Sequence, residues 1–195
     1  MDSKYDAEIF VEGTYNAKNK SYAYSMVIAD NKGLHYFSRA FPEDDKSSMR
    51  NVAGEIVGAQ AGMQYALDNN LKSINIIYDY AGIEAWCNGS WRAKNCHTQQ
   101  YKQFFDKASE KMNIDFTHVK GHSGVEGNEI CDALAKAALG LPDTAERRRQ
   151  YKSVLERAGP YIGNDERQTK QAMLSATAAG IDQEVINNEH TEYQR

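Results

Sequence analysis

The order of extended and helical segments is the feature that most limits what this chain can fold into. Three extended stretches come first, over 7–15, 21–30 and 33–41, with turn-like polar residues between them. The second turn, Asp30-Asn-Lys-Gly33, is typical of a hairpin. Helical and extended segments then alternate. This order predicts an α/β fold in which helices flank a mixed five-stranded sheet.

The later elements follow one another with short connections. We expect helices and strands in this order: a long helix over 50–69, a strand over 72–79, a short helix over 81–88, a helix over 98–112, a strand over 114–120 and a helix over 128–139. A chain of 195 residues with 41% apolar residues suits one globular domain and an appendage. We expect the domain to cover residues 1–140.

Four carboxylates lie in distinct settings along this domain. Glu12 sits in an apolar extended run, and Glu55 lies one turn into the long helix-like stretch. Asp79 ends a strand-like run, and Asp132 opens an alanine-rich helix after a polar loop that contains His122. Acidic groups at strand ends and helix starts can converge, and converging carboxylates need divalent metal to offset their repulsion.

The closing segment, residues 119–135, reads Val-Lys-Gly-His-Ser-Gly-Val-Glu-Gly-Asn-Glu-Ile-Cys-Asp-Ala-Leu-Ala. Together with the order of the other carboxylates, it resembles type 1 ribonuclease H over roughly residues 5–139. Several motifs in the right order are far more specific than any one of them. The resemblance implies a ribonuclease H-like fold and an endonuclease that hydrolyses the RNA strand of RNA–DNA hybrids, leaving 3′-hydroxyl and 5′-phosphate ends.

The resemblance also implies roles for individual residues. It assigns Glu12, Glu55, Asp79 and Asp132 to a catalytic site that holds two Mg²⁺ ions, with Mn²⁺ as a possible substitute. His122, in a Gly-flanked loop, would take up a proton or help to release the product phosphate.

Contacts to the substrate are expected from amides and from a basic segment. Asn51 matches a family position that reads 2′-hydroxyls in the minor groove, although it could also cap its helix. Asn16 is a second candidate of this kind, and Asn128 could orient water or metal. Arg92 and Lys94 lie in a short segment that replaces the longer basic protrusion of many family members.

Glu12 departs from the family, which has aspartate at this position. Glutamate carries the same charge but is one methylene longer, so it would push its carboxylate further into a fixed site. Misplacement by about 1 Å can cost roughly 100-fold in rate. One interpretation is a metal site that is retained but weakened or retuned. The other is an inactive site, in an accessory module that binds nucleic acid without cutting it. Other nucleases and integrases of this fold generally lack such a histidine loop.

The net charge of −4 is unexpected for a protein that grips a polyanion, so the local distribution of charge matters more. Basic residues exceed acidic ones between residues 89 and 112, with Trp86, Trp91 and Tyr101 interleaved. This segment is either a surface that follows the nucleic-acid backbone or an ordinary solvated helix face with core aromatics.

Residues 141–195 form a polar extension whose apolar positions are spaced as narrow helical stripes. Weakly amphipathic helices of this kind do not fold alone, so we expect them to pack on the domain or on a protein partner. The cluster Arg147, Arg148 and Arg149 could touch phosphates, but we expect a solvated face.

The cysteines and the apolar pattern suggest where the protein works. The three cysteines, Cys87, Cys96 and Cys131, are scattered and indicate reduced thiols. No apolar stretch reaches the length of a membrane span, and the first residues lack an apolar signal core. We expect a cytoplasmic protein with no membrane partner.

Overall fold

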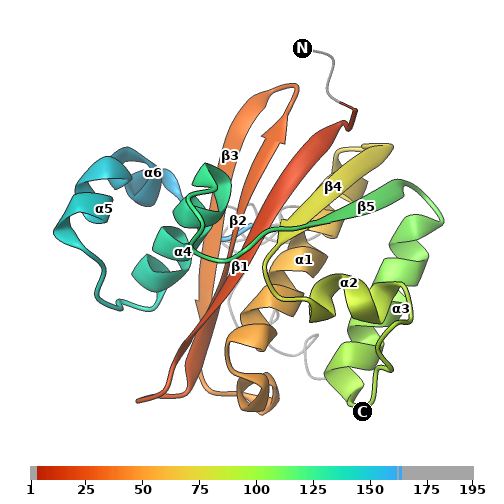
Figure 1. The fold of residues 1–195 in the computed structure, drawn as a ribbon, viewed down its shortest axis with the longest axis horizontal. Helices are drawn as coiled ribbons and strands as arrows, with labels where there is room; N and C mark the ends of the chain where they lie inside the picture. Colours follow the sequence, from red (N-terminus) through yellow and green to blue (C-terminus); the bar gives the residue numbers. More distant parts are fainter. Residues whose placement is uncertain (1–3, 162, 164–195) are drawn as a thin grey trace, which may run out of the picture. The chain divides into compact units, whose positions relative to one another are not determined.

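A five-stranded mixed sheet forms the centre of the protein, as the sequence predicts. The structure is a computed structural model that describes residues 4–161 and 163. The strands are β1 (Ala7–Asn16), β2 (Ser21–Asp30), β3 (Gly33–Phe41), β4 (Ser73–Tyr78) and β5 (Asn113–His118). They lie in the order β3-β2-β1-β4-β5 (Figure 1), with β1 antiparallel to β2 and parallel to β4.

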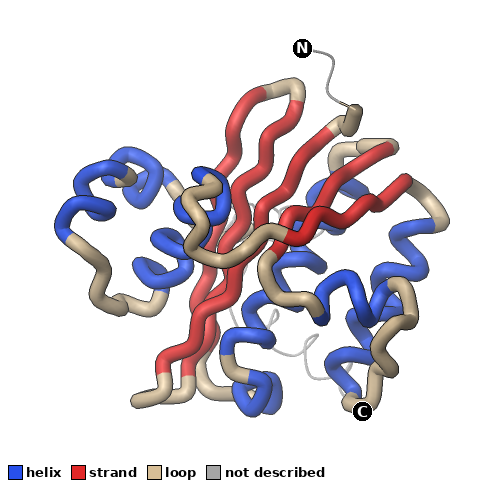
Figure 2. Tube along the Cα trace, viewed as in Figure 1, coloured by secondary structure: helices blue, strands red, loops and turns tan. Residues whose placement is uncertain are grey.

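The helices follow the expected order along the chain (Figure 2). They are α1 (Asn51–Asp68), α2 (Gly82–Cys87), α3 (Cys96–Ser109), α4 (Glu126–Ala138), α5 (Ala145–Gln150) and α6 (Lys152–Arg157), with a 3-10 turn at Asp45–Met49. One expectation was wrong: α4 begins at Glu126, so Asp132 lies inside the helix and does not open it. Glu126 and Glu129 favour this earlier start because acidic groups in the first turn interact well with the helix dipole.

Successive side chains along a strand point to opposite faces of the sheet, and apolar side chains form a core on each face. Ile9 and Val11 of β1 belong to the larger core, which packs against α1, α2 and α3. Phe10, between them, packs with Val27 of β2 and Leu134 of α4 in the smaller core. The two helix layers are visible on either side of the sheet in Figure 1.

Two glycines let α1 approach β1 more closely than other residues would. A Cβ atom on Gly13 would lie 2.3 Å from the amide nitrogen of Glu55, and one on Gly54 would lie 2.1 Å from the carbonyl oxygen of Ala23. Both contacts are with backbone, which cannot move aside easily. The close approach brings Glu55, the residue after Gly54, directly beside the strand that carries Glu12.

Part of the extension packs on the sheet. Tyr151 and Val154 are buried in the smaller core, beside α4. The chain then runs along β3, where Ser38 donates its amide hydrogen to the carbonyl oxygen of Gly159 at 2.9 Å. Tyr161 follows and is buried in the larger core. The compact unit therefore continues to Tyr161, and the extension covers the exposed edge of β3.

Two further expectations concern cysteines and membranes. Cys87, Cys96 and Cys131 are free thiols, as expected. Within residues 4–161, we find no helix that combines the length and the apolar character needed to cross a membrane. The helical stretches expected beyond residue 164 lie outside the described residues.

Candidate active site

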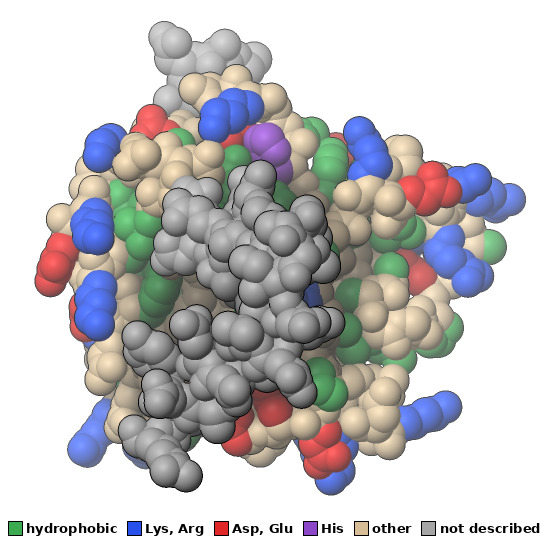
Figure 3. Space-filling view, turned by 180° about the vertical axis from the view of Figure 1, so that it is seen from behind, with side chains coloured by type: hydrophobic (Ala, Val, Ile, Leu, Met, Phe, Trp, Pro, Cys, Tyr) green, Lys and Arg blue, Asp and Glu red, His purple; other side chains and the backbone are tan. Residues whose placement is uncertain are grey.

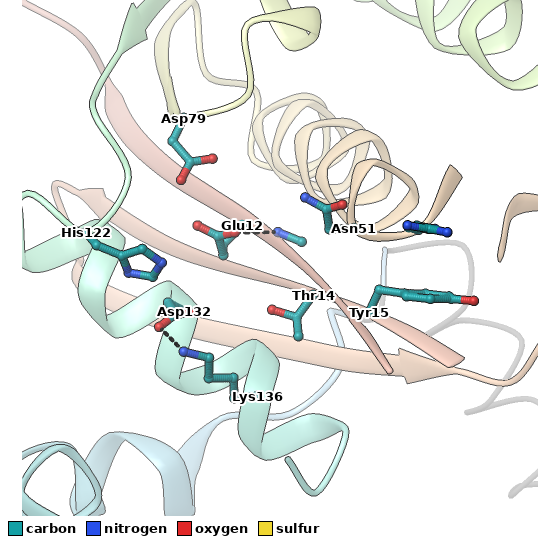
Figure 4. A pocket seen from close by; sticks show the side chains of 10 residues that line it. Glu12, Thr14, Tyr15, Asn51, Asp79, His122, Asp132 and Lys136 are labelled. Carbon is teal, nitrogen blue, oxygen red and sulfur yellow. Dashed lines mark hydrogen bonds and ion pairs between the residues drawn. The ribbon is translucent and has the colours of Figure 1, made fainter. Parts of the chain in front are cut away.

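Three carboxylates from three different elements meet at one end of the sheet. Glu12 comes from β1, Glu55 from α1, and Asp79 from the residue that follows β4. One oxygen of each lies within 4.8 Å of the others. In Figure 4 the Glu12 and Asp79 side chains point toward each other across the pocket. The sequence analysis expected carboxylates at strand ends and helix starts to converge. In the structure these three come together because β1 and β4 are parallel neighbours and α1 lies against β1.

Burial and mutual repulsion make the ionised forms of two of these groups costly. Burial, with the charges of Asp79 and Asp132, raises the pKa of Glu12 to about 8. Burial, with the charges of Glu12 and Asp79, raises the pKa of Glu55 well above its usual value. Glu55 is only 1% exposed, and its Oε2 has no hydrogen-bond partner among the described residues. A buried oxygen without a donor, beside two further carboxylates, suits a divalent cation.

Asp132 lines the same pocket but has different neighbours. Its Oδ2 accepts hydrogen bonds from the Lys136 Nζ and from the Arg147 Nη1, each at 2.7 Å. Burial alone would raise the pKa of Asp132, but these two cations outweigh it and hold the pKa below its usual value. The pKa of Asp132 is therefore shifted in the opposite direction from the pKa values of Glu12 and Glu55.

His122 reaches the pocket from the loop between β5 and α4. Its backbone has a φ of 53°, and its side chain is exposed. A Cβ atom on the preceding residue, Gly121, would lie 2.5 Å from Oδ2 of Asp79, so a larger residue there would displace this carboxylate. The loop thus passes directly over Asp79 and places His122 at the rim (Figure 4).

The pocket contains five of the expected residues: Glu12, Asn51, Asp79, His122 and Asp132. Glu55 does not line the pocket, because it is buried beside Glu12 and Asp79. The sequence analysis did not include the other lining residues, Gly13, Thr14, Tyr15, Arg50 and Lys136. Lys136 has a sequence signal, because residues i and i+4 of a helix lie on one face and Lys136 follows Asp132 by four.

The remaining expected contact residues lie outside the pocket lining. Asn16 ends β1, and its Oδ1 accepts the amide hydrogen of Lys18 at 3.0 Å. Asn128 is buried in α4, one turn before Asp132, and its Oδ1 has no partner among the described residues. Arg92 and Lys94 are exposed in the connection between α2 and α3.

The three aromatic residues that the sequence analysis named near the basic segment lie partly in the core and partly at the surface. Trp86 and Tyr101 are buried, whereas Trp91 is 44% exposed and packs edge-on against Trp86. In the view from behind (Figure 3), Lys and Arg side chains are scattered among other types over the visible described part of this face. The exposed aromatic and basic residues in the connection between α2 and α3 are Trp91, Arg92 and Lys94.

One expectation about the extension was wrong. Arg147 does not belong to a solvated face: its side chain is 20% exposed and binds Asp132, while Arg148 and Arg149 are exposed. The sequence carries no local signal for this difference, because it depends on how α5 packs beside α4.

The sequence of this chain is similar to those of ribonucleases H. The RNase H family model matches residues 4–140. Ribonuclease HI of Vibrio vulnificus is 27% identical over 143 residues, which cover 69% of this chain and 90% of that protein. Ribonuclease H of Actinobacillus pleuropneumoniae is 38% identical over 63 residues, which cover 31% of this chain and 41% of that relative.

Solved structures share the fold. RNase H1 from the archaeon Halobacterium salinarum superposes with a TM-score of 0.57 at 18% identity, covering 69% of this chain and 97% of that one. The N-terminal RNase H domain of a Mycobacterium tuberculosis protein gives a TM-score of 0.55 at 14% identity, with the same coverage. Because the family model matches residues 4–140 of a 195-residue chain, this protein belongs to the ribonuclease H family.

Proposed function

We propose that this protein is a metal-dependent endoribonuclease that hydrolyses the RNA strand of RNA–DNA hybrids to 3′-hydroxyl and 5′-phosphate ends. Membership of the ribonuclease H family supports ribonuclease activity on such hybrids in general. The observation that carries the metal-dependent step is the group of three carboxylates, drawn from β1, α1 and the end of β4, with oxygens within 4.8 Å of one another.

The carboxylates would hold two Mg²⁺ ions, with Mn²⁺ as a substitute, together with Asp132 from the opposite wall. When bound, such a pair of ions activates a water molecule and neutralises charge on the departing oxygen. The protein's task is to keep four acidic groups in one place despite their repulsion. The raised pKa values of Glu12 and Glu55 reflect the cost of that arrangement, which divalent cations would offset.

The groups at the rim would bind the hybrid and handle protons. His122 is exposed beside Asp79, where an imidazole can take up a proton or assist release of the product phosphate. Asn51, at the first position of α1, lines the pocket and would donate to 2′-hydroxyl groups, with Asn16 as a further polar contact. The buried Asn128 would instead orient water or metal. Arg92 and Lys94 would follow the backbone of one strand.

The test is cleavage of an end-labelled RNA–DNA hybrid, first with Mg²⁺, then with Mn²⁺, and then with a chelator. We expect cuts in the RNA strand only when metal is present, and no cleavage of duplex DNA. Asp79→Asn should abolish cleavage and leave the melting temperature of the metal-free protein unchanged or higher, because it removes a repelling charge. Equal cleavage of DNA–DNA and RNA–DNA duplexes would contradict the proposal, and hybrid binding without cleavage would instead favour an accessory module.

A further inference from the structure

Arg147 joins the extension to the active site. It lies in α5, beyond the residues that the family model matches, yet its side chain binds the carboxylate of Asp132. We propose that Arg147 is a positioning residue that fixes Asp132 for metal binding. This inference rests on the proposed function, in which Asp132 is one of the metal ligands.

The guanidinium group of Arg147 links α5 to α4 through two hydrogen bonds. Nη1 donates to Oδ2 of Asp132 at 2.7 Å, and Nη2 donates to the backbone carbonyl oxygen of Glu129 at 2.7 Å. The backbone is held as well, since the Arg147 amide donates to Oγ1 of Thr144, the N-cap of α5. A planar guanidinium with two separate acceptors has little freedom to rotate.

Both cations on Asp132 hold the same oxygen, Oδ2. Lys136 alone would be a weak restraint, because it is a flexible side chain at i+4 on the same helix. Arg147 comes from a separate helix and restrains the carboxylate from outside α4. With Oδ2 held by two cations, the Asp132 carboxylate has less freedom to rotate. Outer partners of this kind commonly contribute about 10-fold to 100-fold in metal affinity or activity.

Replacing Arg147 would change the affinity for metal in opposite directions for a positioning role and for a purely electrostatic role. Arg147 carries a positive charge near a cation site, so its removal would strengthen metal binding if charge alone mattered. If Arg147 positions Asp132, its removal weakens metal binding instead. Arg149 is the matched control, because it lies in the same helix and is exposed.

The experiment is calorimetric titration of the full-length, metal-free protein with Mn²⁺ in the absence of nucleic acid. We expect the Kd for Mn²⁺ to rise about 10-fold in Arg147→Met and to stay within about twofold in Arg149→Met. Arg147→Lys, which keeps the charge and one of the two bonds, should fall between Arg147→Met and the native protein. The Mg²⁺ concentration that gives half-maximal hybrid cleavage should shift in the same order.

The other outcomes are equally informative. Unchanged or tighter Mn²⁺ binding by Arg147→Met, with native binding present, would overturn the positioning role and leave the proposed function intact. A native protein that binds no metal would overturn both. Arg147→Met could be too unstable to titrate, in which case Arg147→Lys is the test. Mn²⁺ binding by Arg147→Lys equal to that of the native protein would overturn the positioning role of the guanidinium and its two hydrogen bonds.

Discussion

At the scale of single residues, the site combines carboxylates with opposite electrostatic surroundings. Glu12 and Glu55 are buried beside other acids, and their pKa values are raised. Asp132 is buried as well, but two cations hold its pKa below its usual value. A cation would therefore relieve the repulsion that raises the pKa values of Glu12 and Glu55, whereas Asp132 already has cationic partners within the protein.

The length of Glu12 gives a first prediction. Its Oε1 accepts the amide hydrogen of Gly13 at 3.3 Å, so the side chain folds back toward its own backbone. If this longer side chain strains the site, Glu12→Asp should cleave hybrid faster with Mg²⁺, by up to about 100-fold. Mn²⁺ should help the native protein more than the variant, because Mg²⁺ demands near-ideal octahedral geometry. Hybrid cleavage by both proteins is measured across titrations of each metal; a slower variant with Mg²⁺ would mean that the site has adapted to glutamate.

The raised pKa of Glu12 gives a second prediction, on metal-free protein. The pKa is about 8 in the folded state against 4.5 for a free side chain. Between these values the folded protein holds more protons than the unfolded chain, so the free energy of unfolding falls as pH rises. We expect the melting temperature in chelator to drop from about pH 5 to about pH 8, and to drop less in Glu12→Gln. Parallel curves for the two proteins would show that Glu12 is not the group responsible.

At the scale of elements, the site depends on how closely α1 approaches the sheet. Gly13 and Gly54 face each other across that contact, and Glu55 follows directly in the helix. Neither glycine has a positive φ, so the requirement is one of space rather than of backbone conformation. The same contact supports the larger core and positions Glu55, one of the proposed metal ligands.

This contact gives a third prediction with a control in the same helix. Gly54→Ala should destabilise the protein by about 3 kcal/mol or more, since its Cβ would overlap backbone atoms of β1 and β2. In Gly58→Ala the nearest atoms would be 3.4–3.5 Å away, an ordinary contact. That change should be close to neutral, because alanine also favours helix by about 1 kcal/mol. Urea denaturation measures both, and equal effects would contradict the argument.

At the scale of the whole molecule, the described part of the extension closes the fold. It covers the smaller core with Tyr151 and Val154, pairs with the edge of β3 at Gly159, and buries Tyr161 on the other face. It also supplies Arg147, whose side chain binds Asp132. The segment that follows the family-matched region therefore contacts both the sheet and a residue of the candidate site.

The fourth prediction compares two shortened chains. A chain ending at residue 140 should be less stable than one ending at residue 163, because burying each large apolar side chain contributes about 1.5–3 kcal/mol. The shorter chain should also need more Mg²⁺ for half-maximal cleavage, since Asp132 loses Arg147. Melting temperatures and Mg²⁺ titrations of the two chains provide the measurement. Identical values would mean that residues 141–161 contribute nothing to either property.

The sequence by itself determined the elements, their order and the family to which the chain belongs. Strand and helix patterns are local, so the five strands and the helices from α1 to α4 lie within a few residues of their expected ranges. The acidic residues and His122 lie in motifs whose order identifies the family. These properties depend on residues that are close together along the chain.

Only the tertiary structure decided how those residues are held. It placed Asp132 against two cations, brought Glu55 to the other carboxylates through the Gly13–Gly54 contact, and separated Arg147 from its exposed neighbours. Each of these facts depends on the packing of segments far apart in sequence, which no local pattern records. Arg147 and Arg149 carry the same side chain in one short helix, and only the position of α4 beside them makes one a partner of Asp132 and leaves the other at the surface.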